Sequence, residues 1–115
     1  MENTNKLSVN MSAKDVFNAK RASLPIDEII GKPIKVKGFA LADTTDKETG
    51  EVRQVGYVVS DEGLVYGFVS DICREGIADL IDMYNEDNSI LNGLEIIFMK
   101  SISKSGRNFN YIHIK

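Results

Sequence analysis

The pattern of apolar and polar positions predicts a protein built mainly of β-strands. Five segments are rich in β-branched and aromatic residues. In each of them apolar and polar side chains alternate, or both faces are apolar, as is typical of β-strands. They are residues 34–42, 52–60, 64–69, 94–102 and 108–115. Asp61-Glu62-Gly63 predicts a tight turn between the second and third strands, and a turn with Gly106 joins the last two into a hairpin. Gly38, in the middle of the first strand, indicates a bulge or a sharp bend.

Two further segments have helical spacing. Ser12 is positioned to cap a short helix over Ala13–Ala22, with Asp15 as its capping-box partner. Ser70 begins a second helix between the third and fourth strands. The apolar stripe of this second helix consists of Ile72, Cys73, Ile77, Leu80, Ile81 and Tyr84. Its solvent-facing side carries Glu75, Asp79, Asp82 and Glu86. We expect Cys73 to be a buried, unreactive thiol.

The order of these elements is that of the OB-fold, a small five-stranded Greek-key barrel with one helix between strands 3 and 4. We assign residues 26–115 to this mainly β domain and residues 1–25 to a flexible N-terminal arm or short helix. The first and fourth strands of such a barrel are neighbours, so we expect Lys35, Lys37 and Lys100 to lie close together. OB-folds bind ligands through the central strands and two loops, which here are residues 43–51 and 103–108.

The composition is that of one soluble domain and indicates no catalytic chemistry. The chain has 115 residues, of which 43% are hydrophobic and 27% charged, and no apolar run approaches the roughly 20 residues of a membrane helix. Cys73 is the only cysteine, which excludes an internal disulfide or a cysteine-rich metal site. With one histidine and neither a nucleophile–base pair nor a phosphate-binding glycine motif, we expect no enzyme and no cofactor. The first residues do not resemble a signal peptide, which predicts a cytoplasmic protein.

Charge is distributed unevenly along the chain, whose formal net charge is −3. Residues 1–42 carry seven Lys/Arg and four Asp/Glu, residues 43–92 three and twelve, and residues 93–115 four and one. The two ends are therefore positive and the middle is strongly acidic. Such asymmetry can create a local positive field on an acidic protein, although solvated faces that differ by chance account for it equally well.

The final strand suggests a use for such a field. Alternation places Phe109, Tyr111 and His113 on one face, and Ile112 and Ile114, which we expect in the core, on the other. An outward row of rings beside a basic loop suits base stacking and phosphate binding. The stacking candidates, of which we expect about half to be buried, are Tyr57, Tyr66, Phe68, Phe109, Tyr111 and His113. The phosphate candidates are Lys35, Lys37, Arg53, Lys100, Lys104 and Arg107.

Several motifs resemble those of the single-stranded DNA-binding proteins of bacteriophages. They are Ile30-Gly-Lys-Pro-Ile-Lys-Val-Lys-Gly38, Gly63-Leu-Val-Tyr-Gly67, Ser70 at the helix start, and Lys104-Ser-Gly-Arg-Asn-Phe-Asn-Tyr111, within a resemblance over about residues 26–115. The resemblance implies an OB-fold protein that coats single strands of DNA, or of RNA, during replication or recombination in the host cytoplasm. Replication proteins and further copies of the chain are candidate partners, and the sequence does not give the oligomeric state. The chain departs from related binders in having no tryptophan and no acidic C-terminal tail, so we expect no recruitment through a tail.

Two other functions fit the same elements. An OB-type protein-interaction module, acting as a replication accessory factor or as an inhibitor of a host enzyme, would bind a basic partner through the acidic middle of the chain. A carbohydrate-binding barrel would stack its aromatic rings on a sugar without any dependence on salt. Salt-sensitive binding of an oligonucleotide distinguishes nucleic-acid binding from both.

Overall fold

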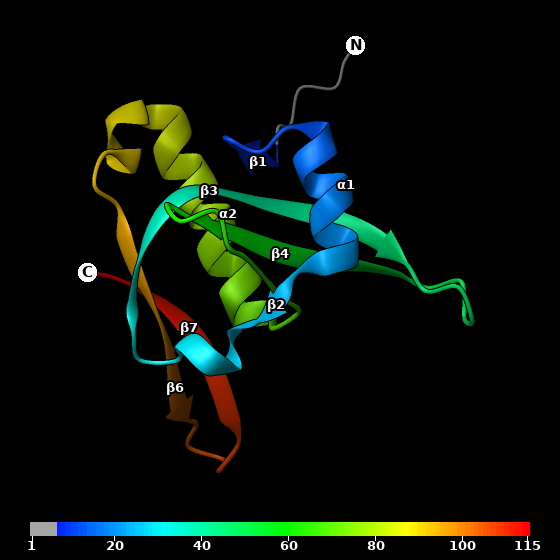
Figure 1. Cartoon of the computed structure of the whole chain (residues 1–115). Helices are drawn as coiled ribbons and strands as arrows, with labels where there is room; N and C mark the ends of the chain where they lie inside the picture. Colours follow the sequence, from blue (N-terminus) through cyan, green and yellow to red (C-terminus); the bar gives the residue numbers. More distant parts are fainter. Residues whose placement is uncertain (1–6) are drawn as a thin grey trace.

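The structure is a computed structural model that describes residues 7–115. Within these residues it contains seven β-strands, two α-helices and two 3-10 helices (Figure 1). The strands are β1 (Ser8–Val9), β2 (Leu24–Pro25), β3 (Pro33–Thr45), β4 (Val52–Ser60), β5 (Val65–Phe68), β6 (Glu95–Ile102) and β7 (Asn108–Ile114). The helices are α1 (Ala13–Ala22), η1 (Ile26–Ile29), α2 (Asp71–Glu86) and η2 (Asn88–Leu91). The first six residues of the predicted N-terminal arm lie outside the described residues.

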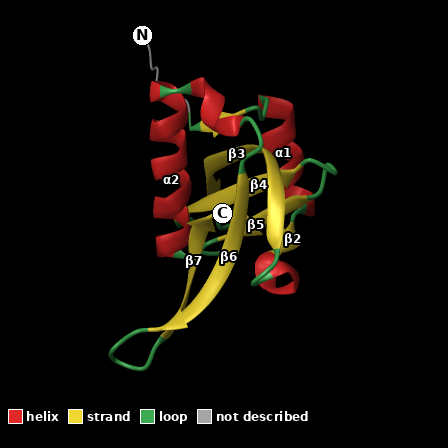
Figure 2. Ribbon diagram, turned by 90° about the vertical axis from the view of Figure 1, so that its left-hand side faces the viewer, coloured by secondary structure: helices red, strands yellow, loops and turns green. Residues whose placement is uncertain are grey.

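The strands form one curled sheet that stays open. All five predicted strands are present, and β1 and β2 are short additions from the N-terminal segment. The strand order is β2-β5-β4-β3-β6-β7, with β1 paired to β3, and hairpin β6–β7 turns away from β4 and β5 (Figures 1 and 2). Within residues 7–115 no pairing joins β5 to β7. The prediction of a mainly β, barrel-like protein with a helix before the last hairpin is therefore confirmed in this coarser form.

Strand β3 bends at a bulge and serves both halves of the sheet. Its start pairs with β6, and from Val36 onward it pairs with β4, with a register shift between Val36 and Gly38. A Cβ on Gly38 would lie 2.7 Å from the main-chain oxygen of Val9, so glycine lets β1 approach β3 closely. The bulge predicted at Gly38 is confirmed. It also shifts the alternation by one residue, so Phe39 and Leu41 are buried in the core while Lys35 and Lys37 are exposed.

The main core lies between the concave side of the sheet and helix α2. Cys73, Ile77, Leu80 and Ile81 of the helix are buried against it, as predicted from their spacing. Phe68 of β5 and Phe98 of β6 meet edge to face with their ring centroids 5.2 Å apart, which joins the two ends of the curled sheet through one aromatic contact. The prediction that Ile72 is buried is wrong, because it lies in the first turn of α2 beyond the sheet and is 41% exposed. Tyr84 is only half-buried.

Helix α1 covers the opposite, convex face of the sheet. It starts as predicted with a capping box: the Ser12 hydroxyl oxygen accepts from the Asp15 amide at 3.1 Å, and the Ser12 amide donates to the Asp15 carboxylate at 2.9 Å. These hydrogen bonds lower the pKa of Asp15. Beneath the helix, a second cluster of Met11, Ala19, Ala40 and Tyr57 is buried. The central strands β3, β4 and β5 are therefore covered on both faces.

We expect Gly38→Ala to lower the free energy of unfolding by about 1–3 kcal/mol, because its Cβ would clash with backbone atoms of β1 rather than with a flexible side chain. Urea denaturation measures this cost. In a chain lacking residues 1–10 the clashing atoms are gone, so the same substitution should cost much less. An equal cost in both chains would show that the approach of β1 is not what requires glycine.

We expect Cys73 to react with thiol reagents only when the protein unfolds. The side chain is fully buried, and this burial raises the pKa of the thiol, so little reactive thiolate forms at neutral pH. Labelling rates with a chromogenic disulfide, with and without urea, test this. Rapid stoichiometric labelling of the native protein would contradict the packing of α2 described above.

Candidate nucleic-acid interface

Hairpin β6–β7 presents two chemically distinct faces. Its register is regular from Ile96↔Ile114 to Ile102↔Asn108, so cross-strand partners share a face. One face, directed away from the core, carries Phe109, Tyr111 and His113 of β7 with Ser101, Met99 and Ile97 of β6 opposite them. The other face carries Phe98 and Ile112, which point toward the core. Nearer the turn of the hairpin, the same face carries Lys100, Ile102, Asn108 and Asn110. We call these the outer and inner faces.

The rings on the outer face form a small aromatic surface. Phe109 and Tyr111 have their ring centroids 5.9 Å apart with planes inclined by 40°. Both are half-buried and His113 is exposed. The row of rings predicted from alternation is therefore present. Met99 pairs with Tyr111, is half-buried and extends this aromatic surface. Its part in the surface was not predicted from the sequence, although a hairpin with its turn at Gly106 already implies the pairing of Met99 with Tyr111.

The orientation of β7 is fixed by Ile112, which packs against helix α2. A Cβ placed on Gly76 of the helix would lie 3.2 Å from Ile112 Cδ1, so the absence of a side chain there allows the strand to lie close. Ile112 also packs on the main core. The prediction that Ile114 is a core residue is wrong: it stands at the end of β7 and is 43% exposed.

The loop that joins β6 to β7 is ordered by Ser103. Its hydroxyl oxygen accepts from the Arg107 amide at 3.1 Å, and its amide donates to the Arg107 carbonyl at 2.8 Å. Gly106 closes the turn with a φ of 85°, a conformation that glycine adopts readily. Lys104 and Arg107 are exposed, and within residues 7–115 neither side chain forms an ion pair. Two cations thus border the rings on a defined loop.

Beyond Glu95 at the start of β6, the hairpin and the end of the chain contain no carboxylate side chain. Residues 96–115 include four Lys/Arg and no Asp or Glu. The exposed carboxylates of α2, which include Asp79 and Asp82, belong to a separate element. The hairpin is therefore a locally positive projection on a protein of net negative charge.

Three of the six predicted stacking residues are buried in the core. Tyr57 is 2% exposed beneath α1, and Tyr66 and Phe68 are 7% and 6% exposed in the main core. Burial also raises the pKa of Tyr57. The expectation that about half of the rings would be buried is met, and these three are removed from the candidate interface because a base cannot reach their faces.

The predicted convergence of lysines on β3 and β6 does not occur. The two strands are neighbours as expected, but their register places Lys35 opposite Glu95. Lys100 lies five positions farther along β6, about 17 Å at the rise of a β-strand, and is on the inner face opposite Asn110. Arg53 pairs with Thr44 in hairpin β3–β4, which projects elsewhere. Neighbouring strands therefore do not bring these cations to one place.

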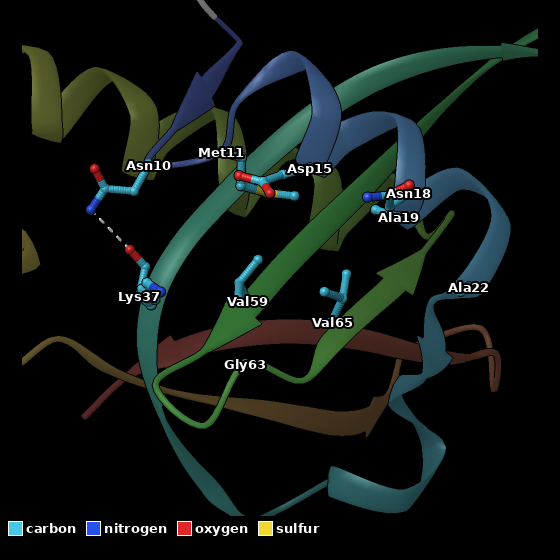
Figure 3. Close-up of a pocket in the computed structure, with 10 residues that line it drawn as sticks. All are labelled: Asn10, Met11, Asp15, Asn18, Ala19, Ala22, Lys37, Val59, Gly63 and Val65. Carbon is cyan, nitrogen blue, oxygen red and sulfur yellow. Dashed lines mark hydrogen bonds between the residues drawn. The ribbon is translucent and has the colours of Figure 1, made fainter.

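Lys37 lies at a cavity under helix α1, away from the hairpin. The cavity has a volume of about 340 Å³ and is lined by α1, the residues before it, β4 and β5 (Figure 3). Val59 and Val65 of the sheet point up toward the helix in Figure 3. The side-chain amide of Asn10 donates a hydrogen bond to the main-chain carbonyl of Lys37 at 3.1 Å. The surface of the central strands, where a ligand was expected, is occupied by the protein's own N-terminal segment.

The candidate interface is thus reduced to one surface, which we call the hairpin surface. It consists of Lys104, Arg107, Phe109, Tyr111, His113 and Met99. A cleft of about 500 Å³ lies beside it, between the inner face and the start of α2, lined among others by Ile72, Ser103, Arg107 and Asn110. Arg107 and Phe109 are therefore shared between the hairpin surface and this cleft.

Comparison with known proteins does not place the chain in a family. No family model, no curated protein and no solved structure matches it. In the described part of the chain there is no group of three or more His, Cys, Asp or Glu side chains arranged to hold a metal ion. The helices of that part are also too short or too polar to cross a membrane.

Buried and outward tyrosines should differ sharply in their effect on stability. We expect Tyr66→Ala to cost about 3–5 kcal/mol, the range for a buried aromatic residue, because Tyr66 lies in the main core. Tyr111→Ala on the outer face should cost about 1 kcal/mol or less. Urea denaturation of both variants checks the assignment, and a large loss for Tyr111→Ala would place that ring in the core.

Proposed function

We propose that this protein binds single-stranded DNA without sequence specificity through the hairpin surface. The observation that carries the proposal is the pair of adjacent outward rings, Phe109 and Tyr111, bordered by the exposed Lys104 and Arg107 on a hairpin with no carboxylate beyond Glu95 at its base. Each base stacked on an aromatic ring contributes about 1–3 kcal/mol with little dependence on sequence. The cations add phosphate contacts that weaken as salt rises.

The spacing of the rings favours an extended single strand over a duplex. Their centroids are 5.9 Å apart, whereas bases stacked in a B-form strand repeat every ~3.4 Å. Two neighbouring bases that each stack on one ring therefore cannot remain stacked on each other. Strands with weak internal stacking, such as oligo-dT, should bind more tightly than oligo-dA, because less base stacking is lost.

The strand order supports an OB-fold as the framework. Strands β3, β4 and β5, helix α2 and strands β6 and β7 follow one another as in that fold, with β3 between β4 and β6. Strands β1 and β2 are additions to it. OB-folds bind ligands on the second and third strands and on two loops. Here α1 covers those strands, so the two loops remain accessible, and of these the loop of hairpin β6–β7 is the basic one, next to the rings of the outer face.

The motifs that resemble phage single-stranded DNA-binding proteins include this loop and strand, over residues 104–111. We therefore propose a role in coating single strands during phage DNA replication or recombination. The competing proposal is a protein-interaction module that binds a basic partner. It is favoured by one observation, the wholly exposed acidic side of α2 with Glu75, Asp79, Asp82 and Glu86.

Fluorescence anisotropy with labelled oligo-dT at two salt concentrations tests the proposal. We expect binding that weakens with salt, and Tyr111→Ala should weaken it by about 5- to 150-fold, equivalent to one stacked base. Lys104→Gln should weaken binding and reduce the salt slope by about one. Arg53→Gln, on the other projecting hairpin, is the matched control and should change neither.

Absence of oligo-dT binding at low salt would reject nucleic-acid binding and favour the protein-interaction module. An unchanged dissociation constant for a folded Tyr111→Ala variant would reject the hairpin surface as the site. Oligo-rU and oligo-dA in the same titration give the preference between RNA and DNA and the effect of base stacking.

A further inference from the structure

Two hairpins of opposite charge project from the protein in different directions. Residues 43–53 of hairpin β3–β4 carry four Asp/Glu and two Lys/Arg, whereas residues 100–110 of hairpin β6–β7 carry three Lys/Arg and no carboxylate. The first hairpin extends sideways and the second downward in Figure 1. Because the two tips point in different directions within one molecule, a contact between them would join two molecules.

The acidic tip has a defined shape. The Asp46 carboxylate accepts from the Glu48 amide at 2.8 Å, and the Asp46 amide donates to the Glu51 carbonyl at 2.8 Å. Gly50 has a φ of 75° and its amide donates to the Asp46 carbonyl at 2.8 Å. Asp46 is thus used inside the turn, while the exposed side chains of Glu48 and Glu51 remain free for contact with a partner within the described part of the chain.

Each tip also exposes a large aliphatic side chain. Val52 beside the acidic turn and Ile102 beside the basic loop are both 66% exposed, the highest values among the large hydrophobic residues that the structure describes. Exposed aliphatic residues are common singly. Val52 and Ile102, however, stand at two tips of opposite charge. A contact between the two tips would therefore explain the exposure of both side chains.

The basic hairpin has a receptor-like cleft on its inner face. The cleft of about 500 Å³ separates the hairpin from the start of α2 and is lined by Ile72, which is 41% exposed, and by Arg107. Lys100 and Ile102 lie on the same inner face of the hairpin. One carboxylate, Asp71, borders the cleft, and it forms an ion pair with Arg74. Within the described part of the chain the cleft lining therefore combines apolar side chains with Arg107, a cation that forms no ion pair there.

We propose that the acidic tip of one copy docks in this cleft on a second copy, head to tail. Glu48 and Glu51 would face Lys100 and Arg107, and Val52 would contact the aliphatic side chains at the cleft. Because the two surfaces differ, the contact is heterologous and each copy retains a free tip and a free cleft, so association continues into open chains.

This self-association does not require nucleic acid and leaves Tyr111 on the outer face uncovered, while Phe109 borders the cleft. If the proposed function is correct, successive copies would present their outer faces along one strand. The contact is small and exposed ion pairs contribute only about 0–1 kcal/mol each, so we expect weak association that is visible at high protein concentration and disappears as salt rises.

Sedimentation velocity of the full chain without DNA, at about 0.05 M and 0.5 M salt, tests the proposal. We expect concentration-dependent association at low salt that is lost at high salt. Glu48→Lys and Lys100→Glu should each abolish it, and the two substitutions combined in one chain should restore it because the charges are exchanged. Ile102→Ser should weaken association about tenfold, equivalent to 1.4 kcal/mol, at unchanged net charge.

Asp82→Lys, on the exposed side of α2, changes net charge equally and is the control that should leave association intact. A protein that remains monomeric at low salt overturns the proposal, and so does a charge-exchanged double variant that fails to associate while remaining folded by circular dichroism. Binding of a short oligo-dT separates this outcome from the proposed function: Glu48→Lys should retain it, whereas Tyr111→Ala should weaken it by about 5- to 150-fold and still self-associate.

Discussion

The bend of strand β3 is the constraint on which the rest of the structure depends. A single strand must pair with β6 at its start and with β4 over the remainder, and the register shift between Val36 and Gly38 makes both pairings possible. The same bulge turns Phe39 and Leu41 toward α2, where they complete the main core. Gly38 additionally admits β1 to the edge of β3 that β6 has left. Without this bend the sheet could not curl around α2.

The covering of the central strands by α1 determines where a ligand can bind. Tyr57, Val59 and Val65 lie beneath the helix, and both ends of the segment are held by strand pairing, β1 to β3 and β2 to β5. A second glycine, Gly67, allows this docking, since a Cβ there would lie 2.6 Å from Ser23 Oγ. The accessible chemistry is therefore displaced to hairpin β6–β7, which depends on the core through Phe98 and Ile112 but projects beyond it.

Local features could be predicted from the sequence and relationships in space could not. The capping box of Ser12 and Asp15 follows from four consecutive residues, and the outward rings of β7 follow from alternation, so both predictions match the structure. The neighbouring strands β3 and β6 were also expected, but adjacency does not fix register, and Lys35 lies opposite Glu95 rather than near Lys100. The cover over Tyr57 depends on a helix of which Ala19 is the only fully buried residue, and so weak an apolar signal does not reveal where a helix packs.

The edge-to-face contact of Phe68 and Phe98 has a consequence for how the chain folds. Phe98 follows Phe68 by thirty positions, and the pairing of Lys35 with Glu95 spans sixty. Closing such long loops costs chain entropy before any burial is gained, which slows folding. During synthesis, the apolar surfaces of β3, β5 and α2 remain exposed to solvent until β6 leaves the ribosome. The nascent chain is most prone to aggregation in that interval.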